Sequence, residues 1–489
     1  MTGTSSVLQH IPCGYRRLFG QLSRSGIAPL TVKLTLYAHP TSLSSLFDQS
    51  ERIQGLTVDG AAQYFYEFIG QLRDYNFPIL SSLSLDPTYD REGLLAGFSE
   101  TLPANLLDGR LPNLREVTLK SMGLQWLSLS GLSTLSLTQC GDSSDGIVTP
   151  TFDRLLEMLG FCPQLHTLNL DLTIPPPIRD HPYPTIVLPA LACLCLRDDV
   201  TGCTALLNHL QIPSRASIRI FPFNVNTGMD MKAILVPIRK HVRTPGAQAL
   251  SLLQMECQAR SGDSDGGPGI AFCTMTLFSD TVLHIVETDS PQCTLSLNFH
   301  PSTEGALRQI VTKLLHAIPS NLITHLDAHC LIYPREVTWK AIVKLLPALD
   351  TVHLRFNDGA VHCVRALTQT ETRDPQYQSF PRVRRLYITA YSKIEDNMIA
   401  NVIDALEEYF STCNANENPF ELLEIDDKRS VLSAPSTQER LDRLFPLMVG
   451  RIVCNGRVHD PVRIQQERAA WQAKMKLFRA QHGIDSDSE

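Results

Sequence analysis

Two stretches of the chain have residue types and spacings that could support chemistry, and the first is GDSDG at residues 262–266. It matches the pattern GxSxG, in which Ser264 would be the nucleophile of a hydrolase. That pattern works where a buried strand precedes the serine and a helix follows it. Here the surrounding QARSGDSDGGPG (258–269) is rich in Gly, Ser and Asp and predicts a loop. The segment also lacks the spacing and the late Glu of an EF-hand loop. We therefore expect no catalytic residue in it.

The second stretch is THLDAHC, in which His325, Asp327 and His329 could suggest a metal site. On a helix, histidines four residues apart would converge on one ion. This segment reads instead as a strand, where residues four apart share a face but lie roughly 13 Å from each other. One ion cannot bind both histidines at that separation. A pairing of Asp327 with His353 on the next strand remains an alternative. We expect no metal.

Other nucleotide, metal and cofactor motifs are absent from the sequence in a usable context. No Walker A, HExxH or GxGxxG pattern lies between a strand and a helix. The sequence therefore predicts a protein that is not an enzyme and needs no cofactor. If the protein binds a partner, other residues of the chain must form the binding surface.

A degenerate frame recurs along most of the chain and predicts how its elements are arranged. The frame is an apolar residue or Cys, then Pro, and then three apolar residues at fixed spacing. It reads LPNLREVTL (111–119), CPQLHTLNLDL (162–172), LPALACLCLRD (188–198), LPALDTVHLRF (346–356) and FPRVRRLYIT (380–389). This is the strand of a leucine-rich repeat, and LSTLSLTQC (132–140) fits its L-x-x-L-x-L-x-x-N/C pattern without error. The Pro blocks a helix and favours extended backbone ahead of each strand.

Segments with helical periodicity alternate with these strands. They cover 151–162, 302–318, 337–349 and 396–410, and a strand follows each within a few residues. The first begins at Thr151, a candidate N-cap, and the second at a Ser-x-Glu cap at 302–304. Alternation at this spacing gives parallel strands joined by crossovers. The predicted fold is α/β, an irregular leucine-rich-repeat solenoid with a curved parallel sheet and outer helices.

The same reading divides the chain into three parts. Residues 1–60 form an N-terminal cap, 61–430 the solenoid, and 431–489 a C-terminal helical cap with an acidic tail. Short strands without helices predict a β-rich interruption at about 246–300. The helix at 462–480 is expected to cap the last repeat, with partner binding as the alternative.

Composition limits the class of partner and the compartment. Across 489 residues, 43 Lys and Arg face 50 Asp and Glu, for a net charge of −7. Broad attraction to nucleic acid or anionic lipid is therefore not expected, and no run is long enough to span a membrane. The 13 cysteines are spread singly, several inside apolar frames, which indicates reduced buried thiols. With no secretory signal visible, we expect a cytoplasmic or nuclear protein.

Several segments resemble one known family. They are LSRSGIAPLTVKL (22–34), RIQGLTVDG (52–60), TALLNHLQIPSRASIRI (204–220), PFELLEIDD (419–427) and LFPLMVGRIVCNG (444–456). In this order they resemble the fungal (mushroom-type) F-box-like proteins with leucine-rich repeats. The resemblance implies a substrate-recognition array of a ubiquitin ligase. Residues before Leu22 hold no LPxE-type F-box start, so a Skp-type adaptor is an expected partner only if an F-box is present upstream. The alternative function is a stand-alone interaction scaffold with no ubiquitin role.

The residues most suited to recognition lie at outward positions of the late strands. Parallel strands stack about 4.8 Å apart, so these side chains should form one polar ladder on the concave sheet face. Arg, Tyr and His suit recognition of carboxylates, phosphates or peptide edges. The alternative is a solvated sheet face with no partner. We expect an unidentified protein to bind at His325, Asp327, His329, His353, Arg355, Arg385, Tyr387, Glu424 and Asp426.

Overall fold

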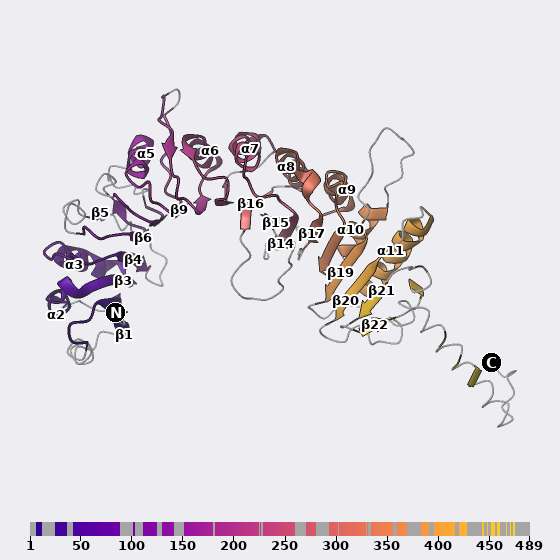
Figure 1. Ribbon diagram of the computed structural model, residues 1–489, viewed down its shortest axis with the longest axis horizontal. Coiled ribbons are helices and arrows are strands. Elements are labelled where there is room, and N and C mark those ends of the chain that lie inside the picture. Colours follow the sequence, from indigo (N-terminus) through magenta and orange to yellow (C-terminus); the bar gives the residue numbers. More distant parts are fainter. Residues whose placement is uncertain are drawn as a thin grey trace. The chain divides into compact units, whose positions relative to one another are not determined.

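The computed structural model describes the repeat strands, most helices and parts of the connections (Figure 1). The described residues are 6–11, 25–36, 43–88, 101–102, 111–124, 130–140, 151–178, 181–223, 225, 228–259, 270–279, 293–301, 303–328, 330, 334–355, 359–368, 383–390, 396–415, 420–427, 443–444, 447, 451–454, 457–459, 466, 470 and 473–474. The chain forms two compact units, residues 1–225 with 236–247, and residues 226–235 with 248–489.

The first unit is a stack of parallel strands. In order of pairing the strands are β1 (Ser6–Ile11), β2 (Leu30–Leu36), β3 (Ile53–Ala61), β4 (Ser82–Thr88), β6 (Glu116–Lys120), β8 (Thr134–Thr138), β9 (Thr167–Asp171), β11 (Cys193–Arg197) and β13 (Ser217–Ile220). Its helices, which lie on one face of the sheet (Figure 1), are α2 (Ser44–Phe47), α3 (Ala62–Leu72), α5 (Phe152–Gly160) and α6 (Val200–His209). Two short parallel pairs join β5 (Thr101–Leu102) to β7 (Gly123–Leu124) and β10 (Ile186–Val187) to β12 (Leu210–Gln211).

The second unit combines an antiparallel segment with a parallel stack. The antiparallel strands are β14 (Leu252–Ala259), β15 (Ile270–Phe278) and β16 (Cys293–Phe299). Parallel pairing continues from β14 through β17 (His325–Ala328), β18 (Thr351–Arg355), β19 (Arg385–Ala390), β20 (Leu422–Asp427) and β21 (Arg451–Cys454), and β22 (Arg457–His459) turns back against β21. The helices α8 (Glu304–Ala317), α9 (Glu336–Lys344), α10 (Ala360–Thr368) and α11 (Asp396–Ala415) lie on one face of this sheet (Figure 1). The helix α7 (Gly228–Val242) contains the division between the units.

A recurring tight turn explains the repeat frame. In each described example the first apolar residue accepts a hydrogen bond from the backbone N–H three residues later, at 3.0–3.2 Å, and Pro is the second residue. The turns are Phe77–Leu80, Leu111–Leu114, Cys162–Leu165, Leu188–Leu191 and Leu346–Leu349. Pro suits this position because its fixed φ matches the second residue of a type I or II turn. Both apolar ends of every turn are buried. The Pro is therefore part of a tight turn whose two ends are buried in the core. The sequence had predicted only that it favours extended backbone ahead of the strand.

A second backbone pattern links each repeat to the next. The carbonyl just before one strand accepts two N–H groups from the start of the following strand. For example, Ser133 O accepts from His166 N at 2.7 Å and from Thr167 N at 3.1 Å. In the second unit, Asp350 O accepts from Arg384 N at 2.8 Å and Arg385 N at 3.1 Å. These bonds fix the register, so corresponding residues of adjacent strands share one level.

Alternation along the strands separates the core from the opposite face. In β8, Leu135 and Leu137 are fully buried, whereas Thr134, Ser136 and Thr138 are half-buried. Each buried Leu stabilises the stack by about 1.5–3 kcal/mol relative to an exposed one. The apolar stripe of α5 covers the same core. This arrangement confirms an α/β fold of largely parallel strands with helices on one face.

The structure differs from the sequence-based prediction in three details. The strand β2 pairs with β3, and β3 pairs with β4, so the parallel stack includes strands within residues 1–60, which were predicted as an N-terminal cap. Thr151 occupies the N-cap of α5, but its side chain makes no capping bond. The N-cap of α8 is Thr303, which accepts from Ala306 N, and the predicted cap began at 302.

Some predicted features lie outside the described residues. They include GDSDG (262–266), most of the C-terminal helix at 462–480 and the acidic tail. The segment predicted as β-rich contains β14, β15 and β16. Among the described helices, none is long and apolar enough to cross a membrane.

Candidate functional site

The candidate site is the face of β17–β20 opposite the helices of the second unit. Backbone register places one predicted residue of each strand at the same level: Asp327, His353, Tyr387 and Glu424. Two residues further along each strand, Arg355, Thr389 and Asp426 are aligned. Two residues earlier, His325, Thr351 and Arg385 are aligned. The alignment of the polar ladder is as the sequence predicted. His329 lies outside the described residues.

Burial divides this ladder into an inner and an outer part. Asp327, His353 and Thr389 are only 7%, 6% and 4% exposed, although their positions in the alternation were predicted to face solvent. In β18 both faces are buried, because Thr351 and His353 are as enclosed as Val352 and Leu354. The prediction of solvent exposure is therefore wrong for Asp327 and His353.

The inner part is a polar network that crosses four strands, β14, β17, β18 and β19. His353 Nε2 lies 2.8 Å from Thr389 Oγ1, and His353 Nδ1 lies 3.3 Å from Asp327 Oδ1. The second contact is electrostatic, because it lacks hydrogen-bond alignment and leaves Nδ1 without a hydrogen-bond partner. Gln254 on β14 donates to Asp327 Oδ2 at 3.3 Å. A ring contact of 6.4 Å between centroids places Tyr387 edge-on to His353. The sequence had offered Asp327 with His353 only as a conceivable pair of metal ligands on adjacent strands, and the structure brings the two side chains to 3.3 Å.

The order Asp–His–Thr also matches the order of a catalytic triad, in which the hydroxyl is the nucleophile. A nucleophile must reach its substrate, and the Thr389 side chain is enclosed on all sides. Its strand is paired with β18 and β20 along its length, which engages the neighbouring backbone in the sheet. The geometry is that of a buried polar contact, in which His353 Nε2 is paired with Thr389 and Nδ1 has no hydrogen-bond partner among the described residues.

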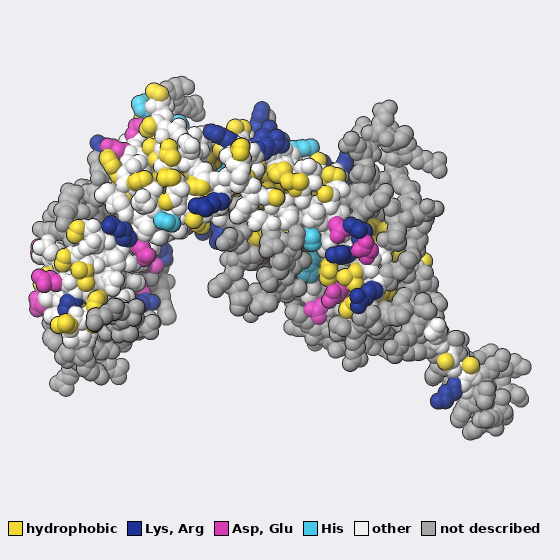
Figure 2. All heavy atoms as spheres, in the orientation of Figure 1, with side chains coloured by type: hydrophobic (Ala, Val, Ile, Leu, Met, Phe, Trp, Pro, Cys, Tyr) yellow, Lys and Arg dark blue, Asp and Glu magenta, His cyan; other side chains and the backbone are white. Residues whose placement is uncertain are grey.

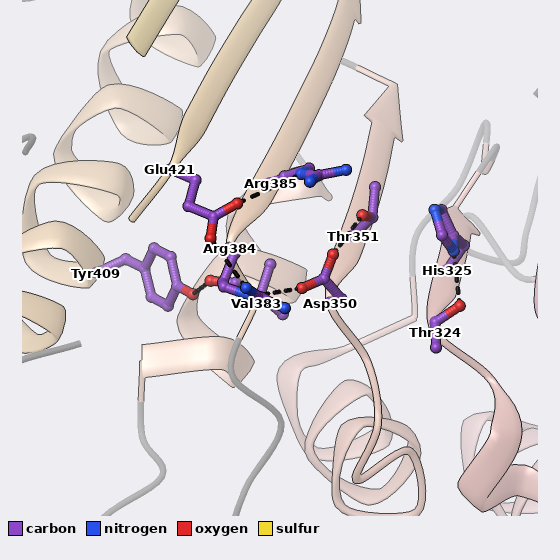
Figure 3. Close-up of polar contacts among 9 residues, drawn as sticks. All are labelled: Thr324, His325, Asp350, Thr351, Val383, Arg384, Arg385, Tyr409 and Glu421. Carbon is purple, nitrogen blue, oxygen red and sulfur yellow. Dashed lines mark hydrogen bonds and ion pairs between the residues drawn. The ribbon is translucent and has the colours of Figure 1, made fainter. Parts of the chain in front are cut away.

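The outer part of the ladder is accessible. Arg385 is exposed, and Tyr387, Glu424, Asp426, Arg355 and His325 are half-buried. The hydroxyl of Thr324 lies 2.8 Å from His325 Nδ1 (Figure 3). Burial lowers the pKa of His325 below its usual range; the Asp350 carboxylate opposes this shift and Arg385 adds to it. Of the predicted ladder, these residues can contact a partner without rearrangement of the strands.

A group of ion pairs beside this ladder was missed by the sequence analysis. Arg384 donates through Nε to Asp350 Oδ1 at 2.6 Å and through its terminal nitrogen to Glu421 Oε1 at 2.9 Å (Figure 3). Arg385 Nε lies 3.6 Å from Glu421 Oε2. Asp350 also accepts from the Thr351 hydroxyl at 3.1 Å. Each of Asp350, Arg384 and Glu421 directly precedes a strand, a position that the apolar frame of the strands does not include.

Figure 2 shows the result on the surface, where Lys or Arg, Asp or Glu and His side chains gather over β17–β20. The charges alternate along the strand starts: acid at Asp350, base at Arg384 and acid at Glu421. Paired charges of this kind lie half-exposed, so a partner can exchange them for its own charges at small cost in desolvation.

The first unit has a charged row that was also missed. Register aligns Thr35, Asp59, Asp86, Lys120, Thr138, Asp171 and Arg197 near the carboxyl ends of their strands. Lys120 pairs with Asp86 at 3.1 Å and Arg197 with Asp171 at 3.7 Å. Burial raises the pKa of Asp171, and Arg197 opposes the shift.

Neither a metal nor reactive thiols emerge from the described residues. Within them, no group of three or more His, Cys, Asp and Glu side chains is arranged to hold an ion. The described cysteines are free thiols, and seven of the ten are buried. Burial raises the pKa of Cys140 and of Cys195 to about 11, which keeps both protonated at neutral pH. Such thiols act as small apolar side chains.

Comparisons with known proteins add little to this geometry. No family model matches the chain, and a search of curated proteins finds no match. Among solved structures, the chain is similar to the leucine-rich-repeat-containing protein LegL7 from Legionella pneumophila, with 11% identity and a TM-score of 0.23 over 88% of this chain and 93% of that one. A TM-score this low carries no argument. The leucine-rich-repeat character of the strands rests on their own frame, turns and register.

Proposed function

We propose that the second unit binds a protein segment on the face of β18–β20 and that the chain catalyses nothing. The observation that carries the proposal is the register of β17–β20, which brings Arg385, Tyr387, Glu424 and Asp426 onto adjacent levels of one face. Arg and Tyr are the residues most often found at the centres of protein interfaces. An extended peptide lying across the strands would meet base, aromatic ring and acid within two levels.

The neighbouring ion pairs favour a charged partner segment. Arg384 and Glu421 already hold each other in place, so their side chains lose little freedom on binding. The buried network under Tyr387 supports this surface from below, since His353 fixes the ring and is itself fixed by Thr389. In this proposal the outer residues contact the partner, and the inner residues hold them in a fixed position.

The architecture proposed for both units is a solenoid of irregular leucine-rich repeats. Its sequence resemblance to fungal F-box-like proteins supports a role in selecting proteins for ubiquitination. A Skp-type adaptor is then a partner only if an F-box lies upstream. The alternative is a stand-alone scaffold. For either role we propose a cytoplasmic or nuclear protein, because its free thiols suit a reducing compartment.

Affinity capture followed by quantitative mass spectrometry tests the binding surface. The variant Arg385→Ala with Tyr387→Ala should lose most of a captured protein, because both side chains would contact it. The matched control is Arg154→Ala with Arg365→Ala, which removes two exposed cations from helices away from this face. Equal recovery with both variants would refute the surface. Recovery of adaptor and cullin together supports the ubiquitin role, and their absence supports the scaffold.

A second experiment tests the absence of catalysis. A fluorophosphonate probe labels activated hydroxyl nucleophiles of the triad type. The native chain should not be labelled, because Thr389 is enclosed. Labelling that is abolished by Thr389→Val would show that the Asp327–His353–Thr389 network is an active site.

A further inference from the structure

The segment around α7 reverses the charge of the rest of the chain. Residues 200–255 hold six Lys and Arg residues and a single acid, Asp230, whereas the net charge of the whole protein is −7. Figure 2 shows Lys and Arg side chains gathered over α7, on the helical side of the molecule. The residues of this segment are not among those of the proposed binding face, so the inference is independent of the proposed function.

Four of these cations come together in the first unit. Arg239, Lys240 and Arg243 are exposed on the last turn of α7 and just after it, and Arg215 is exposed on the turn that precedes β13. The two segments are in contact. A Cβ on Gly246 would lie 3.5 Å from Ser214 Oγ, and the buried His241 interacts with the backbone of Ala216. We call Arg215, Arg239, Lys240 and Arg243 the basic cluster.

The basic cluster is not neutralised within the described part of the protein. None of its members forms an ion pair with a described acid, in contrast to Lys120, Arg197 and Arg384 elsewhere. The partial negative charge at the C-terminal end of α7 attracts cations. That attraction explains why the helix tolerates them, but it supplies no partner for guanidinium and ammonium donors that face solvent.

The structure around the cluster discriminates among anionic partners. The opposite side of α7 is fixed in the core through Ile234, Ile238 and Val242, so a ligand can reach only the outer side of the helix. The exposed residues beside the cations are Val236, Thr244 and Pro245, and none is an aromatic on which a base could stack. One exposed Val gives too little apolar area to insert into a membrane. Carboxylates on a flexible chain satisfy the donors without these requirements.

We propose that the basic cluster binds an acidic peptide segment of a partner protein. Arg239 to Arg243 cover about 6 Å along the helix, and Arg215 extends the surface onto the neighbouring turn. An extended chain advances about 3.3 Å per residue, so four to six residues rich in Glu or Asp reach all four cations. Guanidinium groups hold carboxylates with two parallel hydrogen bonds. The cluster thus serves as a second docking point besides the strand face.

The test uses the full chain and fluorescein-labelled hexaglutamate, with hexaglutamine as the neutral control, followed by fluorescence anisotropy. The variant Arg215→Gln, Arg239→Gln, Lys240→Gln and Arg243→Gln should weaken hexaglutamate binding by about tenfold or more, since each exposed ion pair adds a modest part of the affinity. The matched variant Arg73→Gln, Arg154→Gln, Lys344→Gln and Arg365→Gln removes the same charge elsewhere and should change binding less than twofold. Binding by the native chain should also weaken as salt rises.

Several results would overturn the proposal. They are no binding of hexaglutamate, equal weakening by the two variants, and tighter binding of oligothymidine or of phosphatidylserine vesicles that the cluster variant abolishes. The last two ligands would assign the cluster to nucleic acid or membrane. A second measurement needs no variant. Carbodiimide coupling of bound hexaglutamate should form an amide at Lys240, and peptide mapping that finds no adduct there would refute the contact.

Discussion

Replacing His353 with alanine should destabilise the second unit even though His353 lies on the face expected to meet a partner. The substitution leaves two buried polar atoms without their neighbour, Thr389 Oγ1 at 2.8 Å and Asp327 Oδ1 at 3.3 Å. Each buried group left unsatisfied costs about 1–3 kcal/mol, so a loss of about 2–6 kcal/mol is expected for the two groups. The exposed Arg385 on the next strand provides the control, because Arg385→Ala should change stability by about 0.5 kcal/mol or less.

Urea unfolding monitored by tryptophan fluorescence measures this loss in the right part of the chain. Of the three tryptophans, Trp339 is fully buried in α9 and reports on the second unit. A background with Trp126→Phe and Trp471→Phe isolates its signal. For an m value of about 2 kcal/mol per M, His353→Ala should lower the midpoint by about 1–3 M. A midpoint equal to that of Arg385→Ala, with partner capture lost instead, would show that His353 is a contact residue and that the burial argument is wrong.

Three further predictions address the backbone, the pH dependence and the helix caps. Gly60 has φ +148, and a Cβ there would lie 2.4 Å from a carbonyl oxygen of the adjacent strand. Gly60→Ala should therefore lower the free energy of unfolding, measured with urea, by about 3 kcal/mol or more. Gly70 in α3 has open space around it, so Gly70→Ala should raise the same free energy by about 1 kcal/mol. Burial lowers the pKa of His241, so the unfolded chain binds a proton at this residue more readily than the folded chain does, and stability should fall as pH drops below about 6.5. The variant His241→Gln should reduce the change in urea midpoint between pH 7.5 and 5.5. A pH dependence equal to that of the native chain would count against this assignment. The Asp199 carboxylate caps α6 by accepting from two backbone N–H groups at 2.6 and 3.0 Å, so Asp199→Ala should lower the free energy of unfolding by about 1 kcal/mol. Thr151 makes no such bond at the start of α5, so Thr151→Ala should lower it by less in the same measurement.

Much of the fold could be predicted because its apolar frame is local. The apolar positions of LPNLREVTL, Leu111, Leu114, Val117 and Leu119, are all buried as expected. The same frame occurs at FPILSSLSL (77–85), which forms a turn and β4, so that signal was in the sequence and was missed. The strands β2 and β3 were missed for a different reason. They lack the Pro turn, and only the pairing of β2 with β3 and of β3 with β4 shows that they belong to the stack.

The candidate site could be predicted in its alignment but not in its exposure. Alternation within a strand tells which side chains share a face, and it placed Asp327, His353 and Tyr387 on one level correctly. Whether that face is covered depends on segments distant in sequence, about which a single strand holds no information. The ion pairs of Arg384 show the same limit, since its partners are 34 and 37 residues away.

The strand starts of the second unit show how register and surface chemistry are joined. The carbonyl of Asp350 fixes the start of β19 through two backbone N–H groups, while its carboxylate holds the side chain of Arg384. One residue thus sets both the register of the strand and the position of an exposed cation. A change at Arg384 alters the charge of the surface and leaves the backbone bonds intact, because those bonds use only main-chain atoms. A change in the buried Leu349 of the preceding turn would instead disturb the core at the start of β18. In such a stack we therefore expect the exposed side chains at the strand starts to tolerate substitution better than the buried turn residues, and the proposed partner contacts would come from side chains that contribute little to folding.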